Sequence, residues 1–94
     1  MIIEHRTFRL AAGTADAAFL AADRRVQHEV APFETGFIRR TTARGEDGRW
    51  LVETLWYDDA SATAAEATDA PAVAALRDCI DPATVRIERW TTLD

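Results

Sequence analysis

The clearest pattern of hydrophobic and polar positions lies between residues 36 and 57, GFIRRTTARGEDGRWLVETLWY. Two runs rich in Ile, Thr, Val, Trp and Tyr, residue types that suit a pleated surface, flank the four-residue segment 45–48. Glycines on both sides of its acidic pair supply the positive φ angles that a tight reversal requires. The stretch therefore predicts a β-hairpin, with the remaining elements arranged on either side of it.

Before the hairpin, the pattern predicts a strand followed by a helix. Residues 2–10 form a β-prone run that ends in a glycine turn. From residue 15 to 30 the apolar residues recur at steps of three and four, which is the period of an amphipathic helix. Thr14 or Asp16 is the expected N-cap, and Pro32 marks the end of the helix.

After the hairpin, the pattern predicts a second helical region and a last strand. The helical region starts at residues 58–61 and is interrupted at residues 69–71, where a fresh helical segment begins with Asp69 as its cap. The dipeptide at 81–82, Asp-Pro, stops that segment. Residues 84–92 then form the last strand.

The predicted order is strand, helix, strand, strand, helix, strand, within a single domain spanning residues 1–94. This is the ferredoxin-like βαββαβ arrangement of the α+β class, with a four-stranded antiparallel sheet and two helices on one face. A sheet with water on its other face should alternate cleanly between apolar and polar residues. The hairpin does not, since Trp50, Val52 and Trp56 share one parity and Leu51 and Leu55 share the other. The second apolar face predicts a homodimer packed sheet to sheet.

Composition narrows the class of protein. Hydrophobic residues make up 48% of the chain, but no apolar run approaches the roughly 20 residues of a membrane helix. The net charge is −5 and the basic residues are dispersed, which argues against nucleic acid as a partner. A lone cysteine, Cys79, cannot form an internal disulfide and fits a reducing compartment, so we expect a cytoplasmic protein.

Several catalytic chemistries are disfavoured by the residues present. All basic residues are arginine, so a Schiff base on lysine is excluded, and the lone serine, Ser61, lies at an expected helix start. His5 and His28 are not at metal-ligand spacing, and the glycines form no phosphate-binding loop. We therefore expect no metal and no cofactor.

Short segments along the whole chain carry a family resemblance. They are residues 7–10 and Gly13 around the first strand, 19–23 and Gln27 in the first helix, 36–37, 39–40, 47–50 and Trp56 in the hairpin, and the pairs 71–72 and 81–82. At these positions the sequence resembles the dimeric α/β-barrel superfamily, and within it the antibiotic-biosynthesis-monooxygenase-like domains. The resemblance implies a ligand cavity between the helices and the concave face of the sheet. Members include cofactor-free oxygenases of polyketide quinones, haem-degrading oxygenases, small isomerases and cyclases.

Asp23 is the first candidate for chemistry in that cavity. It follows Phe19 by four residues on or beside the apolar stripe of the first helix, and Gln27 follows four later. A carboxylate directed at a sheet must be hydrogen-bonded or bind something. Two interpretations stay open, namely an acid paired with an arginine and a pocket acid that orients or deprotonates a ligand.

The tryptophans of the sheet are also ambiguous. Trp50, Trp56 and Trp90 are packing residues of a core or a dimer interface, or walls of a pocket for a flat ligand. The resemblance to the quinone-forming oxygenases implies that Trp56 holds the substrate. The asparagine that is often catalytic in that branch and in the haem-degrading branch has no counterpart, because the chain contains no Asn.

His5 is the third candidate for a catalytic residue. Stress-responsive barrels and polyketide cyclases of the superfamily use a histidine of the first strand as an acid or base. A one-residue difference in register reverses the face of a strand, so His5 points either to the cavity or to the dimer side. Arg39 and Arg40 point to opposite faces for the same reason. The expected ligand-binding residues are Phe19, Gln27, Arg39, Trp50 and Trp90.

The sequence thus predicts a small-molecule-pocket protein that resembles cofactor-independent monooxygenases of aromatic or polyketide-like substrates. One alternative is a homodimer that binds a ligand without catalysis or serves a structural role. Another is a histidine-dependent polyketide cyclase or isomerase of the same fold.

Overall fold

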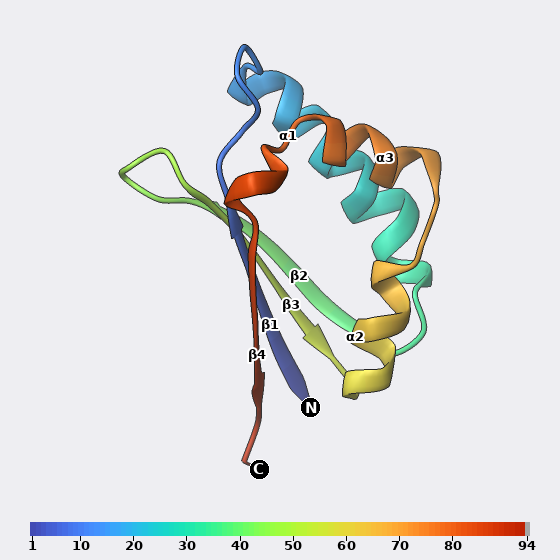
Figure 1. Cartoon of the computed structure of the whole chain (residues 1–94). Helices are drawn as coiled ribbons and strands as arrows, with labels where there is room; N and C mark the ends of the chain where they lie inside the picture. Colours follow the sequence, from blue (N-terminus) through green and yellow to red (C-terminus); the bar gives the residue numbers. More distant parts are fainter. Residues whose placement is uncertain (94) are drawn as a thin grey trace.

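A computed structural model of the chain, described over residues 1–93, shows a four-stranded antiparallel sheet covered on one face by helices (Figure 1). The strands follow the order β2-β3-β1-β4 across the sheet, so the predicted ferredoxin-like fold is confirmed. The elements are β1 (Ile2–Phe8), α1 (Asp16–Arg25), β2 (Phe37–Arg44), β3 (Trp50–Trp56), α2 (Asp59–Glu66), α3 (Pro71–Asp78) and β4 (Arg86–Thr91).

Short irregular helices extend this frame. A π-helix, Val26–Val30, and a 3-10 turn, Ala31–Phe33, continue α1 as far as the loop before β2. A second 3-10 turn, Pro82–Thr84, precedes β4. None of the helices in residues 1–93 has the length and apolar content needed to cross a bilayer.

The strand register separates two faces of the sheet. β1 pairs with β3 so that Phe8 lies opposite Trp50 and Ile2 lies opposite Trp56, and all four side chains are buried beneath the helices. Alternate residues of the two strands, Ile3, His5 and Thr7 of β1 and Leu51, Glu53 and Leu55 of β3, point to the other face, which carries no helix (Figure 1). The two-sided pattern predicted for the hairpin therefore corresponds to a covered face and an open face.

The predicted hairpin is confirmed, with one difference in its turn. Gly48 has a positive φ of 83°, but Gly45 does not belong to the positive-φ glycines. The reversal is closed instead by a hydrogen bond from the Gly45 N–H to the Arg49 carbonyl at 2.7 Å. The Asp47 carboxylate accepts from the Arg49 N–H at 3.1 Å and from its Nε–H at 2.9 Å. These bonds and the Arg49 charge lower the pKa of Asp47.

A β-bulge near the start of β2 changes which arginine faces the helices. The register shifts between Phe37, which lies opposite Trp56, and Arg39, which lies opposite Leu55. Phe37 and Arg40 consequently share the covered face, and Arg39 points to the open face. Simple alternation from Phe37 would have placed Arg39 inward.

Two of the predicted helix caps are wrong. The N-cap of α1 is Ala15 rather than Thr14 or Asp16, and that of α3 is Ala70 rather than Asp69. Neither helix start has a hydrogen bond from a capping side chain. The carboxylate of Asp16 pairs with a strand arginine instead, as described below.

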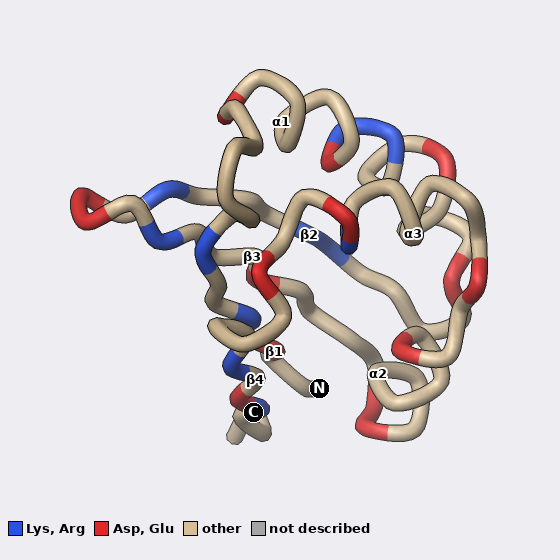
Figure 2. Tube along the Cα trace, turned by 45° about the horizontal axis from the view of Figure 1, so that its top comes forward, with Lys and Arg blue, Asp and Glu red and all other residues tan. Residues whose placement is uncertain are grey.

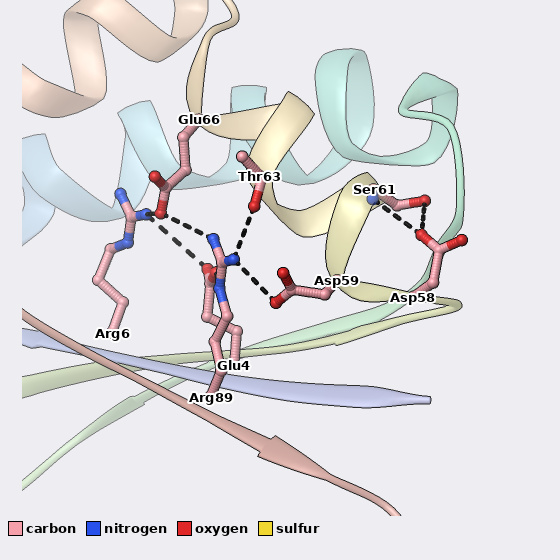
Figure 3. Close-up of polar contacts among 8 residues, drawn as sticks. All are labelled: Glu4, Arg6, Asp58, Asp59, Ser61, Thr63, Glu66 and Arg89. Carbon is pink, nitrogen blue, oxygen red and sulfur yellow. Dashed lines mark hydrogen bonds and ion pairs between the residues drawn. The ribbon is translucent and has the colours of Figure 1, made fainter.

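The start of α2 does have a side-chain cap. Asp58 accepts from the Ser61 N–H at 2.8 Å and from its hydroxyl at 2.6 Å, and these bonds lower the pKa of Asp58 (Figure 3).

The buried apolar side chains form two clusters. The larger is centred on Phe8, Phe19 and Trp50, whose rings lie 5.6 Å (Phe8–Phe19) and 4.6 Å (Phe19–Trp50) apart between centroids. The smaller contains Trp56 and Ala62 near the start of α2. The helix layer is therefore attached to the sheet at both ends of the interlayer space.

Replacing Phe19 with alanine should lower the free energy of unfolding by about 3–5 kcal/mol, because a fully buried aromatic side chain is removed from the larger cluster. Chemical denaturation measures this loss. Phe33→Ala is the matched control, since Phe33 is 80% exposed and should change stability by less than about 0.5 kcal/mol. Equal losses in the two variants would contradict the core position of Phe19.

Candidate functional site

A cavity of about 130 Å³ lies between the helix layer and the covered face of the sheet. It occupies the space between the two apolar clusters, since Phe8, Val52 and Leu76 of one and Trp56 and Ala62 of the other line it. Its walls are mostly apolar, with a small number of charged groups, as is usual for small-molecule sites. The charged lining residues are Glu4, Arg6, Glu34, Arg40, Glu66 and Arg77.

Arg40 is a buried charged residue of the cavity wall, as is Glu4. Its side chain is 7% exposed, and its Nη2 donates to Oδ1 of Asp23, also buried, at 2.7 Å. Nη1 donates to Oε1 of Gln27 at 3.2 Å and to Oγ1 of Thr42 at 3.4 Å. The Thr42 hydroxyl in turn donates to Oδ2 of Asp23 at 2.7 Å. Both carboxylate oxygens are thus satisfied, and the guanidinium is held in one orientation.

Trp56 contributes an aromatic wall and an unpaired donor. Its ring packs edge-to-face on Phe37 with centroids 5.9 Å apart. Its indole Nε1–H is buried and has no hydrogen-bond partner among residues 1–93. A buried donor without a partner costs about 1–3 kcal/mol, so this group marks a position where an acceptor would be favourable.

A network of charged groups closes the side of the cavity between β1, β4 and α2 (Figure 3). Arg89 donates to Glu4 at 3.1 Å, to Asp59 at 3.1 Å and to Glu66 at 3.2 Å. Arg6 also reaches Glu66, at 3.3 Å. Burial disfavours the charged form of Arg89, but the hydrogen bonds to Asp59 and Glu4 and the nearby carboxylate charges outweigh it and raise its pKa.

The predicted site residues are distributed over three environments. Only Trp56 lines the cavity. Asp23 and Gln27 accept hydrogen bonds from Arg40, so Asp23 is paired with an arginine. Phe19 and Trp50 belong to the larger apolar cluster and are not among the residues that line the cavity.

The remaining predicted residues lie on the open face of the sheet. Nε2 of His5 lies 2.7 Å from Oε2 of Glu53, the residue opposite it on β3. Trp90 is 54% exposed beside Ile3, and Arg39 points to the same side because of the bulge. These residues do not line the cavity, since the intervening sheet separates them from it.

Sequence reasoning did not single out Glu4 or Glu34, and it left the choice between Arg39 and Arg40 open. Glu4 is a charged residue at a buried position of β1, where alternation with Ile2 and Phe8 was a usable signal. Glu34 lies in a loop, where no period applies. Among the described residues, no three His, Cys, Asp or Glu side chains are grouped as a metal site would require.

No protein-family model matches the sequence, and no curated protein sequence matches it. Solved structures are similar in fold. SnoaB, a cofactor-independent oxygenase from Streptomyces nogalater, is 22% identical with a TM-score of 0.78, and the alignment covers 99% of this chain and 93% of SnoaB.

Antibiotic-biosynthesis-monooxygenase-like proteins give similar values. One from Caulobacter crescentus is 20% identical with a TM-score of 0.80, covering 99% of this chain and 90% of that one. One from Nitrosomonas europaea is 19% identical with a TM-score of 0.74, over the full length of both chains. The predicted resemblance to antibiotic-biosynthesis-monooxygenase-like domains is thus confirmed at the level of the fold.

Replacing Asp23 with alanine should lower the free energy of unfolding by about 3–5 kcal/mol, because it leaves the Arg40 guanidinium buried without its counter-charge. Asp16→Ala is the matched control, since Asp16 also joins α1 to an arginine of β2, Arg44, at 2.6 Å but in an exposed position. That pair should contribute less than about 1 kcal/mol. Denaturant titrations at one pH compare the two, and equal losses would contradict a special role for burial.

Proposed function

We propose that this chain is a small-molecule-pocket protein that oxygenates an aromatic or polyketide-like substrate without a cofactor. The observation that carries the proposal is the cavity with the Trp56 indole in its wall and the unpaired indole N–H. The fold shared with SnoaB, which is a cofactor-independent oxygenase, supports the same reaction class. The identity to these structures is low, so the proposal depends on the cavity and not on the alignment.

The size of the cavity defines what part of a substrate it holds. A volume of 130 Å³ is close to that of an engineered cavity of about 150 Å³ that binds benzene. One aromatic ring therefore fits into this volume. The cavity is partly open, so further rings of a polyketide-like substrate would extend out of it.

The chemistry assigned to the protein is positioning and proton transfer. An electron-rich enolate or phenolate supplies the electrons to molecular oxygen; one oxygen atom enters the substrate, and the other leaves as water. The mostly apolar walls of the cavity would orient the substrate, and a donor in the wall would stabilise the oxygen on which negative charge develops. The Trp56 Nε1–H has no partner within residues 1–93, and a small rearrangement of the wall would give a ligand oxygen access to this buried donor.

An alternative is a homodimer that binds a ligand without catalysis. The open face presents apolar side chains on adjacent strands, including Leu51, Leu55 and Trp90, and a second copy would cover them. A histidine-dependent cyclase would have to work on this face as well, since His5 lies there beside Glu53. The cavity gives the oxygenase the stronger support.

Aerobic incubation with anthrone, followed by oxygen uptake, tests the reaction. The chain should accelerate uptake above the protein-free rate, and Trp56→Phe should lower kcat/KM roughly 10- to 100-fold because the ring is kept but the donor is lost. Trp90→Phe is the control, since Trp90 lies on the open face and should leave the rate unchanged. The proposal fails if the wild-type chain consumes no more oxygen than buffer.

Sedimentation equilibrium tests the homodimer. Wild-type protein should have twice the mass of the chain. Leu55→Arg should raise the dissociation constant of the dimer roughly tenfold or more, because it places a charge on the open face where the second copy would pack. Phe33→Arg, an exposed substitution on the helix layer, should leave the mass unchanged. A wild-type protein that is monomeric at all concentrations would exclude the sheet-to-sheet dimer.

A further inference from the structure

The carboxylates of the cavity wall differ in whether they pair with an arginine. Glu4 accepts from Arg89 at 3.1 Å, and Glu66 accepts from Arg6 at 3.3 Å and from Arg89 at 3.2 Å. Glu34 also lines the cavity, but its carboxylate forms no hydrogen bond or ion pair within residues 1–93. Glu34 is therefore the lining acid whose oxygens are left available to a ligand.

The backbone fixes Glu34 at the cavity. Its N–H donates to the Ala31 carbonyl at 3.1 Å, and its carbonyl accepts from the Phe37 N–H at 3.2 Å. These bonds tie the loop to both the 3-10 turn and the start of β2. The side chain is half-buried, so it contacts both the cavity and water.

Arg40 provides the complementary group on the same wall. A guanidinium has five N–H donors, and three hydrogen bonds from Nη1 and Nη2 occupy three of them. The Nε–H and one Nη2–H remain. Arg40 and Glu34 both line the cavity, and within residues 1–93 they do not pair with each other.

We propose that Glu34 is the proton acceptor of the cavity and Arg40 the anchor for the ligand oxygen, so that the ligand is a carbon or oxygen acid: an aromatic-ring ketone that can enolise, or a phenol. This inference rests on the proposed function of the cavity as a small-molecule pocket. It adds the residue that removes the proton and the functional group that the ligand must carry.

The step is a proton transfer without oxidation. The C–H bond next to the ligand carbonyl breaks, its electron pair moves into the enolate, and the proton binds a carboxylate oxygen of Glu34. The enolate oxygen accepts from the unused N–H groups of Arg40, whose charge is held in place by Asp23 and Gln27. Glu34 then releases the proton to water through its exposed side. Asp23 is a positioning residue in this scheme.

Deuterium exchange tests the step separately from oxygen chemistry. The protein is incubated without oxygen in D₂O with 2-tetralone, and proton NMR follows the loss of the methylene signal between the ring and the carbonyl. Wild-type protein should exchange this position faster than buffer, and Glu34→Gln should lower the protein-dependent rate roughly 100-fold or more. Glu46→Gln is the matched control, since Glu46 is exposed at the hairpin tip.

Binding is measured in parallel through quenching of tryptophan fluorescence by 2-tetralone. Glu34→Gln should bind as tightly as wild type and remain folded, because Glu34 supports no side-chain contact. Arg40→Lys keeps a positive charge beside Asp23 but loses the planar set of guanidinium N–H donors. This substitution should weaken binding of 2-tetralone roughly tenfold.

The outcomes separate the two proposals. Exchange by Glu34→Gln at the wild-type rate would overturn the role of Glu34, as would wild-type binding without exchange, and neither result would affect the pocket. Absence of binding by the wild-type chain would overturn both. Failure of oxygen uptake with intact exchange would overturn the oxygenase alone and leave the proton acceptor standing.

Discussion

The buried pair between Asp23 and Arg40 determines how the helices sit on the sheet. Most acids lie on helices and turns, whereas many arginines lie along the strands (Figure 2). The pair joins α1 to β2, as the exposed pair of Asp16 and Arg44 does nearby. A buried ion pair contributes little net stability compared with apolar packing, but its geometry is specific. The pair thus fixes the orientation of α1 on β2, in addition to the apolar clusters that pack between the layers.

The cavity follows from this arrangement. Where Arg40 and the network around Arg89 stand between the layers, the apolar core divides into one cluster around Phe19 and another around Trp56. Arginine side chains are long, and the hydrogen bonds to their partners hold the guanidinium groups in fixed positions between the layers. The charged residues therefore border the space that a ligand would occupy. Structure and site depend on the same contacts.

The fold could be predicted from the sequence because its signals are local and periodic: the hairpin, the amphipathic first helix and the order of elements all follow from spacing. The site could not be predicted to the same extent, because it depends on contacts between distant residues. The bulge after Phe37 exchanges the faces of Arg39 and Arg40, and no composition signal marks it. Asp16 was expected to cap α1, but its carboxylate pairs with Arg44 across the layers.

The sheet has two faces with separate physical tasks, and β3 serves both. Trp56 points to the cavity while its neighbour Leu55 points to the open face, so adjacent residues of one strand contribute to ligand contact and to any subunit contact. Backbone hydrogen bonds on both sides of β3 hold the strand in place, since it pairs with β1 and β2. A partner on the open face would therefore not reach the cavity directly. It would act on the cavity only by stiffening the strand that carries Trp56, and each subunit would keep its own complete set of lining groups.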